Sequence, residues 1–167
     1  MNLDEEENKL RMANSELKRV EHMIYVSLKY TRTGDVIINI MKRMVDAYEL
    51  IIDALLEHAQ EKNKIDIIPI TPKQKIKEVK TIFPDIEVRE NIELYTLFKQ
   101  SLKVKCEREN EYRRHVTLRC IIKNEEFEFN IDNMNEFYLK AKNFLSLVID
   151  IMKGKVDGFK IRKEEEE

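Results

Sequence analysis

Two long amphipathic stretches follow one another in the first part of the chain, separated only by YTRTGD at positions 30–35. Apolar residues recur at three- and four-residue steps through residues 3–29 and again through residues 35–62, which places them on one helical face in each stretch. Helices of this length joined by so short a connection fold back antiparallel, because each apolar face needs a partner. The sequence therefore predicts a helical bundle built on a long antiparallel helix hairpin.

The connection itself carries the signals of a helix end and a helix start. Gly34 weakens the continuation of the first helix, Thr33 can cap the second helix, and Asp35 in its first turn suits the helix dipole. We expect the second helix to extend to about Lys62, a length of roughly 40 Å.

Two further helices are expected between Thr71 and the cluster RENEYRRH. Thr71 and Pro72 form a suitable cap and first position for a short helix that ends before Pro84. Asp85 then begins a fourth helix, which is predicted to continue into the cluster RENEYRRH at positions 108–115. Its apolar stripe comprises Val88, Ile92, Tyr95, Phe98, Leu102 and Cys106.

The apolar period changes to two beyond the cluster, which is typical of β-strands. Two alternating segments within residues 116–131, with KNEE at 123–126 as their turn, predict a β-hairpin that packs on the bundle. A fifth helix follows, with Asp132 or Asn133 as its cap and Gly154 at its end. The predicted fold class is mainly α, with one β-hairpin inserted between the fourth and fifth helices.

Length and composition limit the class of protein. The 167 residues fit one domain, which we place at residues 1–154, followed by a charged C-terminal tail at residues 155–167. Lys and Arg total 30 against 32 Asp and Glu, a net charge of −2, so any polyanion site must be a local patch. No uncharged apolar run approaches the roughly 20 residues that cross a bilayer, so a membrane-spanning protein is not expected.

The cysteines and histidines predict neither a disulfide framework nor a metal site. Cys106 and Cys120 form no C-x-x-C motif, and we expect both to be small buried thiols of a cytoplasmic protein. His22 and His58 lack metal-ligand spacing to a second histidine or cysteine, so each is expected at an exposed or boundary position, with no metal and no cofactor. The abundance of Lys, Glu and Ile is a bias reported for hot-living organisms, which suggests a thermophilic source.

The candidate site is the cluster RENEYRRH. Arg108 and His115 are seven residues apart, so on a continuous helix they would share one face about 10 Å apart along the axis. An arginine can grip phosphate oxygens through two donors, and a histidine can transfer a proton near neutral pH. Tyr112 lies between them and could bind phosphate or stack on a base, while Arg113 and Arg114 would steer an RNA substrate.

This cluster, in a chain that begins with a long helical hairpin, resembles the HEPN superfamily of nucleotide-binding helical domains. The resemblance covers about residues 1–150, and its specific part is the R-x6-H spacing, in which Arg108 matches the family arginine and His115 the family histidine. It implies metal-independent cleavage of single-stranded RNA at the interface of a homodimer, with these two residues as the catalytic pair. Glu109 departs from the Asn, Asp or His that usually follows the arginine, and the β-hairpin is an addition to an all-helical plan.

Two functions stay open at this point. The first is a HEPN-like RNA-binding or metal-independent endoribonuclease domain. The second is a non-catalytic helical interaction or scaffold module, such as a homodimer or the partner of a small nucleotidyltransferase, as the near-zero net charge, Glu109 and the large helical faces suggest. In the second case the arginines of the cluster are cations near a helix C-terminus, stabilised by its dipole and by neighbouring glutamates. An Arg108 that is ion-paired, with His115 facing solvent, would favour the second function.

Overall fold

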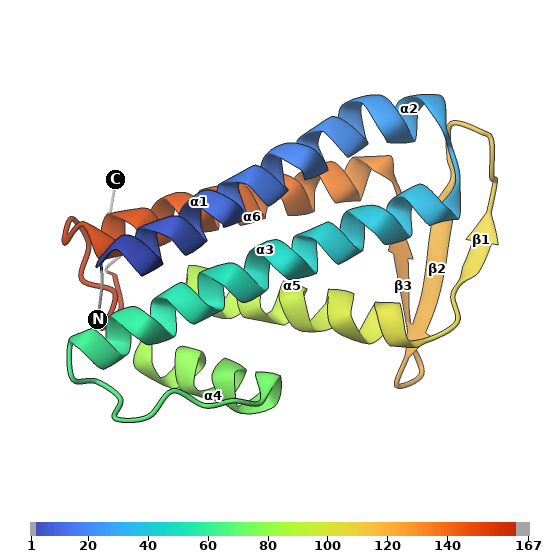
Figure 1. Ribbon diagram of the computed structural model, residues 1–167. Coiled ribbons are helices and arrows are strands. Elements are labelled where there is room, and N and C mark those ends of the chain that lie inside the picture. Colours follow the sequence, from blue (N-terminus) through green and yellow to red (C-terminus); the bar gives the residue numbers. More distant parts are fainter. Residues whose placement is uncertain (1–2, 163–167) are drawn as a thin grey trace, which may run out of the picture.

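The computed structural model describes residues 3–162, and it is mainly helical with a small sheet at one end (Figure 1). The long helices lie side by side, and the sheet closes the end of the bundle at which α3 begins and α5 ends. The predicted fold class is confirmed. The helices are α1 (Leu3–His22), η1 (Met23–Ser27), α2 (Leu28–Tyr30), α3 (Gly34–Glu61), α4 (Pro72–Ile82), α5 (Ile86–Lys103) and α6 (Ile131–Met152).

The predicted antiparallel hairpin forms the frame of the molecule. α1 continues through the π-helical turn η1 and through α2, and the chain then reverses so that α3 packs along α1 (Figure 1). Thr33 caps α3 as expected, because its Oγ1 accepts a hydrogen bond from the amide of Val36 at 3.4 Å. The apolar faces of both helices are buried in one continuous core that also takes in α5, α6 and the sheet.

The sheet has three antiparallel strands in the order β1 (Glu107–Glu109), β2 (Thr117–Ile122) and β3 (Glu125–Phe129). Lys123 and Asn124 connect β2 and β3, and both have positive φ, 52° and 66°, as a two-residue hairpin turn requires. The predicted β-hairpin is therefore present. β1 is the strand that was not predicted, and it is formed by residues expected to be helical.

The last helix begins slightly earlier than expected. Asn130 caps α6 in place of Asp132 or Asn133, and the two asparagines form a reciprocal capping box: Asn130 Oδ1 accepts from the Asn133 amide at 3.0 Å, and Asn133 Oδ1 accepts from the Asn130 amide at 2.9 Å. Gly154, with a φ of 74°, follows the end of the helix as predicted.

The segment expected as a charged tail, 155–167, is described only as far as Arg162, and residues 163–167 lie outside the described residues. The described part packs against the bundle. The ring of Phe159 stacks on His58 and on Phe83, with centroids 5.8 Å and 5.3 Å apart, and Arg162 forms ion pairs with Asp85 and Glu87. Among the helices of residues 3–162, none is long and apolar enough to cross a membrane.

Candidate functional site

The predicted site does not lie on a helix. α5 ends at Lys103, and Val104 leaves it in an extended conformation, with φ −103° and ψ 158°. Asn110 and Tyr112 then adopt positive φ, 55° and 66°, which a helix does not allow. The prediction of a continuous helix through positions 108–115 is therefore wrong. The helix was predicted to extend too far because Cys106 falls at helical spacing from the apolar residues of α5.

A disulfide bond explains much of this local structure. Cys106 and Cys120 are joined, and they stand opposite each other where β1 approaches β2, with Cα atoms 4.4 Å apart. The prediction of two separate thiols is wrong. Because the bond closes the chain around residues 107–119, the whole cluster RENEYRRH lies in a loop fixed at its base.

Arg108 lies on β1 and points towards the bundle. Its strand partner is Leu118, which is buried, and directly opposed residues of an antiparallel pair project from the same face. The Arg108 guanidinium donates to Asp35 in the first turn of α3, with Nη2 2.6 Å from Oδ1. This hydrogen bond raises the pKa of Arg108 above its ordinary value, so the side chain is a permanent cation engaged by a carboxylate.

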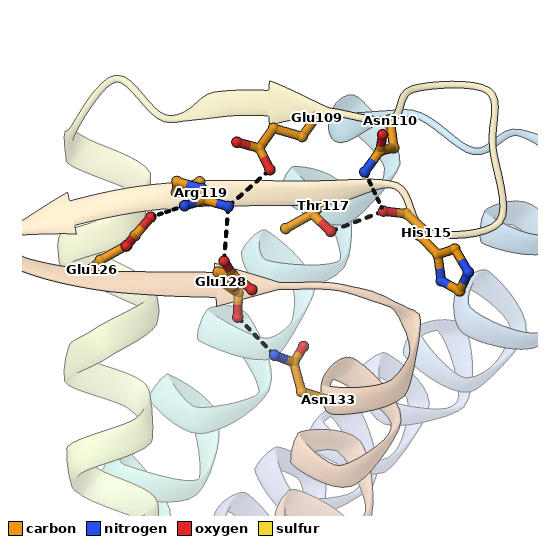
Figure 2. Close-up of polar contacts among 8 residues, drawn as sticks. All are labelled: Glu109, Asn110, His115, Thr117, Arg119, Glu126, Glu128 and Asn133. Atoms are coloured by element: carbon orange, nitrogen blue, oxygen red, sulfur yellow. Dashed lines mark hydrogen bonds and ion pairs between the residues drawn. The ribbon is translucent and has the colours of Figure 1, made fainter.

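His115 lies in the exposed loop between β1 and β2. Its backbone carbonyl accepts hydrogen bonds from Thr117 Oγ1 at 2.9 Å and from Asn110 Nδ2 at 3.5 Å, while its imidazole points away from the other residues drawn in Figure 2. The Arg108 guanidinium is paired with Asp35, and within residues 3–162 no hydrogen bond joins it to His115.

Glu109, the residue that departs from the family pattern, has a partner within the sheet. Arg119 at the centre of the outer face donates to Glu109 Oε2 and pairs with Glu128 Oε1, each at 2.9 Å, and it also pairs with Glu126 (Figure 2). Sequence reasoning assigned no role to Arg119. The alternation of charges in β2 and β3 is the signal for it, because a central cation can pair with residues on both neighbouring strands.

The three residues predicted to bind substrate are all exposed. Tyr112 is 80% exposed, and Arg113 and Arg114 lie beside it in the same loop. Arg114 lines a groove of about 410 Å³ between the loop, α2 and the start of α6, and Tyr112 and Arg113 are not among the residues that line this groove. Its lining residues are Leu28, Lys29, Arg32, Arg114, Val116, Ile131 and Asp132. Three cations and one carboxylate, Asp132, thus surround an apolar floor, and the excess of positive charge suits an anion that also carries an apolar or aromatic part.

A second group of chemically competent residues lies where α3 ends, at the other end of the bundle. His58 is 5% exposed, so its predicted exposed or boundary position is wrong, whereas His22 is exposed as expected. Glu6 of α1 and Glu61 of α3 stand beside the imidazole, and one ligand atom of each of the three residues lies within 4.8 Å of the other two. The spacing H-x-x-E of His58 and Glu61 was the available signal, since residues three apart share a helical face.

Burial changes the protonation of this second group. Burial, followed by the hydrogen bond and the negative charge of Glu61, raises the pKa of Glu6 to about 7. Burial is also the main cause that lowers the pKa of His58, with the charge of Lys62 adding to it. At neutral pH the imidazole is therefore mainly neutral, with one ring nitrogen free to accept.

The cationic groove and the Glu6–His58–Glu61 group thus lie at opposite ends of the bundle (Figure 1). The first is formed by the loop of the predicted site, and the second was not predicted. Comparison of the chain with protein-family models, with curated proteins and with solved structures gives no match.

Proposed function

We propose that this chain is a non-catalytic helical interaction module and that Arg108 of the R-x6-H pair serves its structure. The observation that carries the proposal is the pairing of Arg108 with Asp35 while the His115 imidazole points to solvent. Cleavage of RNA by its own 2′-hydroxyl needs a proton-transfer group and a phosphate-binding cation at the same phosphate. The Arg108 guanidinium is paired with Asp35, and Glu109 is engaged by Arg119.

The test of this proposal is an RNA cleavage assay in EDTA with single-stranded substrate. We expect no cleavage above that of buffer, and no difference between the wild type, His115→Ala and Arg108→Ala. Products with 2′,3′-cyclic phosphate ends that disappear in His115→Ala would overturn the proposal and restore the HEPN-like ribonuclease.

A second candidate function, binding of single-stranded RNA without cleavage, is favoured by the cationic groove. Lys29, Arg32 and Arg114 supply phosphate contacts, and the exposed ring of Tyr112 is available for stacking on a base. Such binding weakens as salt rises, because each neutralised phosphate releases counterions.

Two neighbouring arginines provide a matched pair for this second function. Arg114→Ala should weaken binding of a labelled single-stranded RNA and reduce its salt dependence, measured by fluorescence anisotropy. Arg113→Ala, in the same loop but outside the groove, is the control. Equal losses of RNA affinity in both variants would indicate general electrostatic attraction and not specific binding in the groove.

The remaining expectations from the sequence are retained as parts of the proposal. A homodimer, or a complex with a small nucleotidyltransferase, would give the module its partner, and light scattering at micromolar concentration tests the homodimer. A cytoplasmic location accords with the disulfide if the source is hot-living, because hyperthermophiles are an exception to the scarcity of intracellular disulfides. Membership of the HEPN superfamily rests on the helical hairpin and the spacing of Arg108 and His115.

A further inference from the structure

Glu6 is the most unusual charged residue among those described. It is 1% exposed, and neither of its carboxylate oxygens accepts a hydrogen bond from a donor group within residues 3–162. A hydrogen bond between Glu6 and Glu61 requires a proton on one of the two carboxyl groups. A buried carboxylate without donors is costly, so such a group in a native structure calls for a bound proton or a bound cation. Glu61, which lies beside it, is another carboxylate and adds repulsion when both are charged.

The geometry around Glu6 is close to that of a coordination sphere. His58 Nδ1 lies 3.9 Å from Glu6 Oε2, and the ligand atoms of Glu6, His58 and Glu61 all lie within 4.8 Å of one another. Bonds of about 2.0–2.2 Å to a tetrahedral zinc ion place ligand atoms roughly 3.4 Å apart. The three side chains therefore need to close by only a small amount to share one ion.

We propose that Glu6, His58 and Glu61 bind one divalent transition-metal ion, with Zn²⁺ as the representative probe. One imidazole with two carboxylates suits zinc and its first-row neighbours, whereas calcium and magnesium prefer oxygen ligands alone. The two carboxylates neutralise the charge of the ion. Three protein ligands leave a fourth position, on the side where Glu61 is exposed, for water or another ligand.

The surroundings of the three ligands favour a bound metal ion, and not a lysine ammonium group, as the positive partner of Glu6. Lys9, the lysine of the same stretch of α1, is already paired with Glu57. Lys62 is exposed just beyond the end of α3, and its charge acts on both Glu6 and His58, but within residues 3–162 it forms no ion pair with either glutamate. Phe159 stacks flat on the His58 ring, with 3° between the planes, and helps to hold the imidazole in place. A bound ion would therefore fasten the beginning of α1 to the end of α3.

Zinc binding to the full-length, untagged protein tests the site. The protein is stripped with EDTA, exchanged into chelator-free buffer near neutral pH, and titrated with Zn²⁺. We expect one zinc per chain to be retained after dialysis and the thermal midpoint to rise with Zn²⁺. Co²⁺ should give a visible absorption band that reports its coordination. Glu6→Gln, His58→Gln and Glu61→Gln should each lower the affinity by at least about tenfold.

Two exposed residues of α1 provide matched controls, Glu7→Gln and His22→Gln, and both should bind zinc like the wild type. Glu61 is exposed, so Glu61→Gln keeps the test decisive if a buried substitution prevents folding. Without metal, Glu6→Gln should be at least as stable as the wild type, because it removes a buried charge. No retained zinc with an unchanged midpoint, or equal affinity in all variants, would overturn the proposal and leave a proton shared by Glu6 and Glu61.

Discussion

Arg108 Nη2 lies 2.6 Å from Asp35 Oδ1, so the arginine of the predicted pair connects strand β1 to the first turn of α3. The arginine passes directly over Gly34 on its way to the carboxylate. A Cβ atom at position 34 would lie only 2.8 Å from Arg108 Cγ and 2.9 Å from Cδ. The missing side chain at position 34 is what leaves room for the ion pair.

Gly34→Ala should consequently have opposite effects in two backgrounds. In the wild type the new methyl group displaces Arg108 and breaks its contact with Asp35, so the protein should be destabilised. In Arg108→Ala the clash is absent, and alanine should stabilise the helix by up to about 0.5–1 kcal/mol. Urea unfolding of the four proteins of this cycle measures both effects, and an identical effect in both backgrounds would contradict the expected contact.

Tyr48→Phe should cost about 1–3 kcal/mol of unfolding free energy. The Tyr48 hydroxyl is completely buried and donates to Asn91 Oδ1 at 2.7 Å, while Asn91 Nδ2 donates to the carbonyl of Glu87 at 2.8 Å. Removal of the hydroxyl leaves the buried Asn91 oxygen without a donor. Tyr25→Phe is the control, because the Tyr25 hydroxyl bonds to Asn135 at the surface and should change stability little. Equal losses from both variants would refute the proposed cause.

Protonation of Asp85 in acid should remove part of the stability of the protein. The hydrogen bond from Arg162, with help from the amide of Glu87, lowers the pKa of Asp85 below its ordinary value. Because the folded pKa lies below the unfolded one, the stabilisation is complete above the unfolded pKa of about 4 and is lost as the pH falls through the folded value. Unfolding free energies measured by urea from neutral pH down to about pH 3 should therefore fall more steeply in the wild type than in Asp85→Asn.

A third variant separates the charge of Asp85 from its role as a helix cap. Asparagine can still accept from the amide of Glu87, so Asp85→Asn should keep the cap of α5. Asp85→Ala should lose a further 0.5–2 kcal/mol, approximately, at every pH. A wild type and Asp85→Asn with parallel pH profiles would rule out the ion pair as the source of the pH dependence.

Loss of the Cys106–Cys120 bond should cost about 3 kcal/mol, the value expected for a closed loop of about 15 residues. The double variant Cys106→Ala/Cys120→Ala should show this loss in urea unfolding, and a thiol reagent should detect free thiols in the wild type only after reduction. Dithiothreitol should destabilise the wild type and leave the double variant unchanged. Reactive thiols in the untreated, oxidised wild type would contradict the disulfide.

The sequence was sufficient for the helices because their signals are local. Thr33, Thr71 and Asp85 each accept a hydrogen bond at the start of the helix that they were predicted to begin, and the apolar stripes of α1 and α3 are buried as expected. The turn of the hairpin was predicted at residues 123–126 from the change to a period of two; the structure confines it to Lys123 and Asn124, because Glu125 and Glu126 already belong to β3. Such features depend on neighbours within a few residues.

The features that were missed depend on contacts between distant parts of the chain. Strand β1 exists because residues 107–109 pair with β2, and the disulfide depends on the same pairing, so helical spacing could reveal neither. The burial of His58 requires Phe159, about 100 positions later in the sequence, and Glu6 from the first turns of α1. The ion pair between Arg108 and Asp35 likewise joins residues far apart in the sequence, so the sequence alone could not predict it.

The two edges of the sheet limit how copies of the protein can associate. β1 has only three residues, Glu107–Glu109, and β3 carries Glu125, Glu126 and Glu128 in a strand of five. Strand pairing between two copies along either edge would bring glutamates together, and short, charged edge strands of this kind disfavour edge-to-edge association of sheets. A shared sheet between two copies is therefore disfavoured, and we expect any homodimer to form through other surfaces.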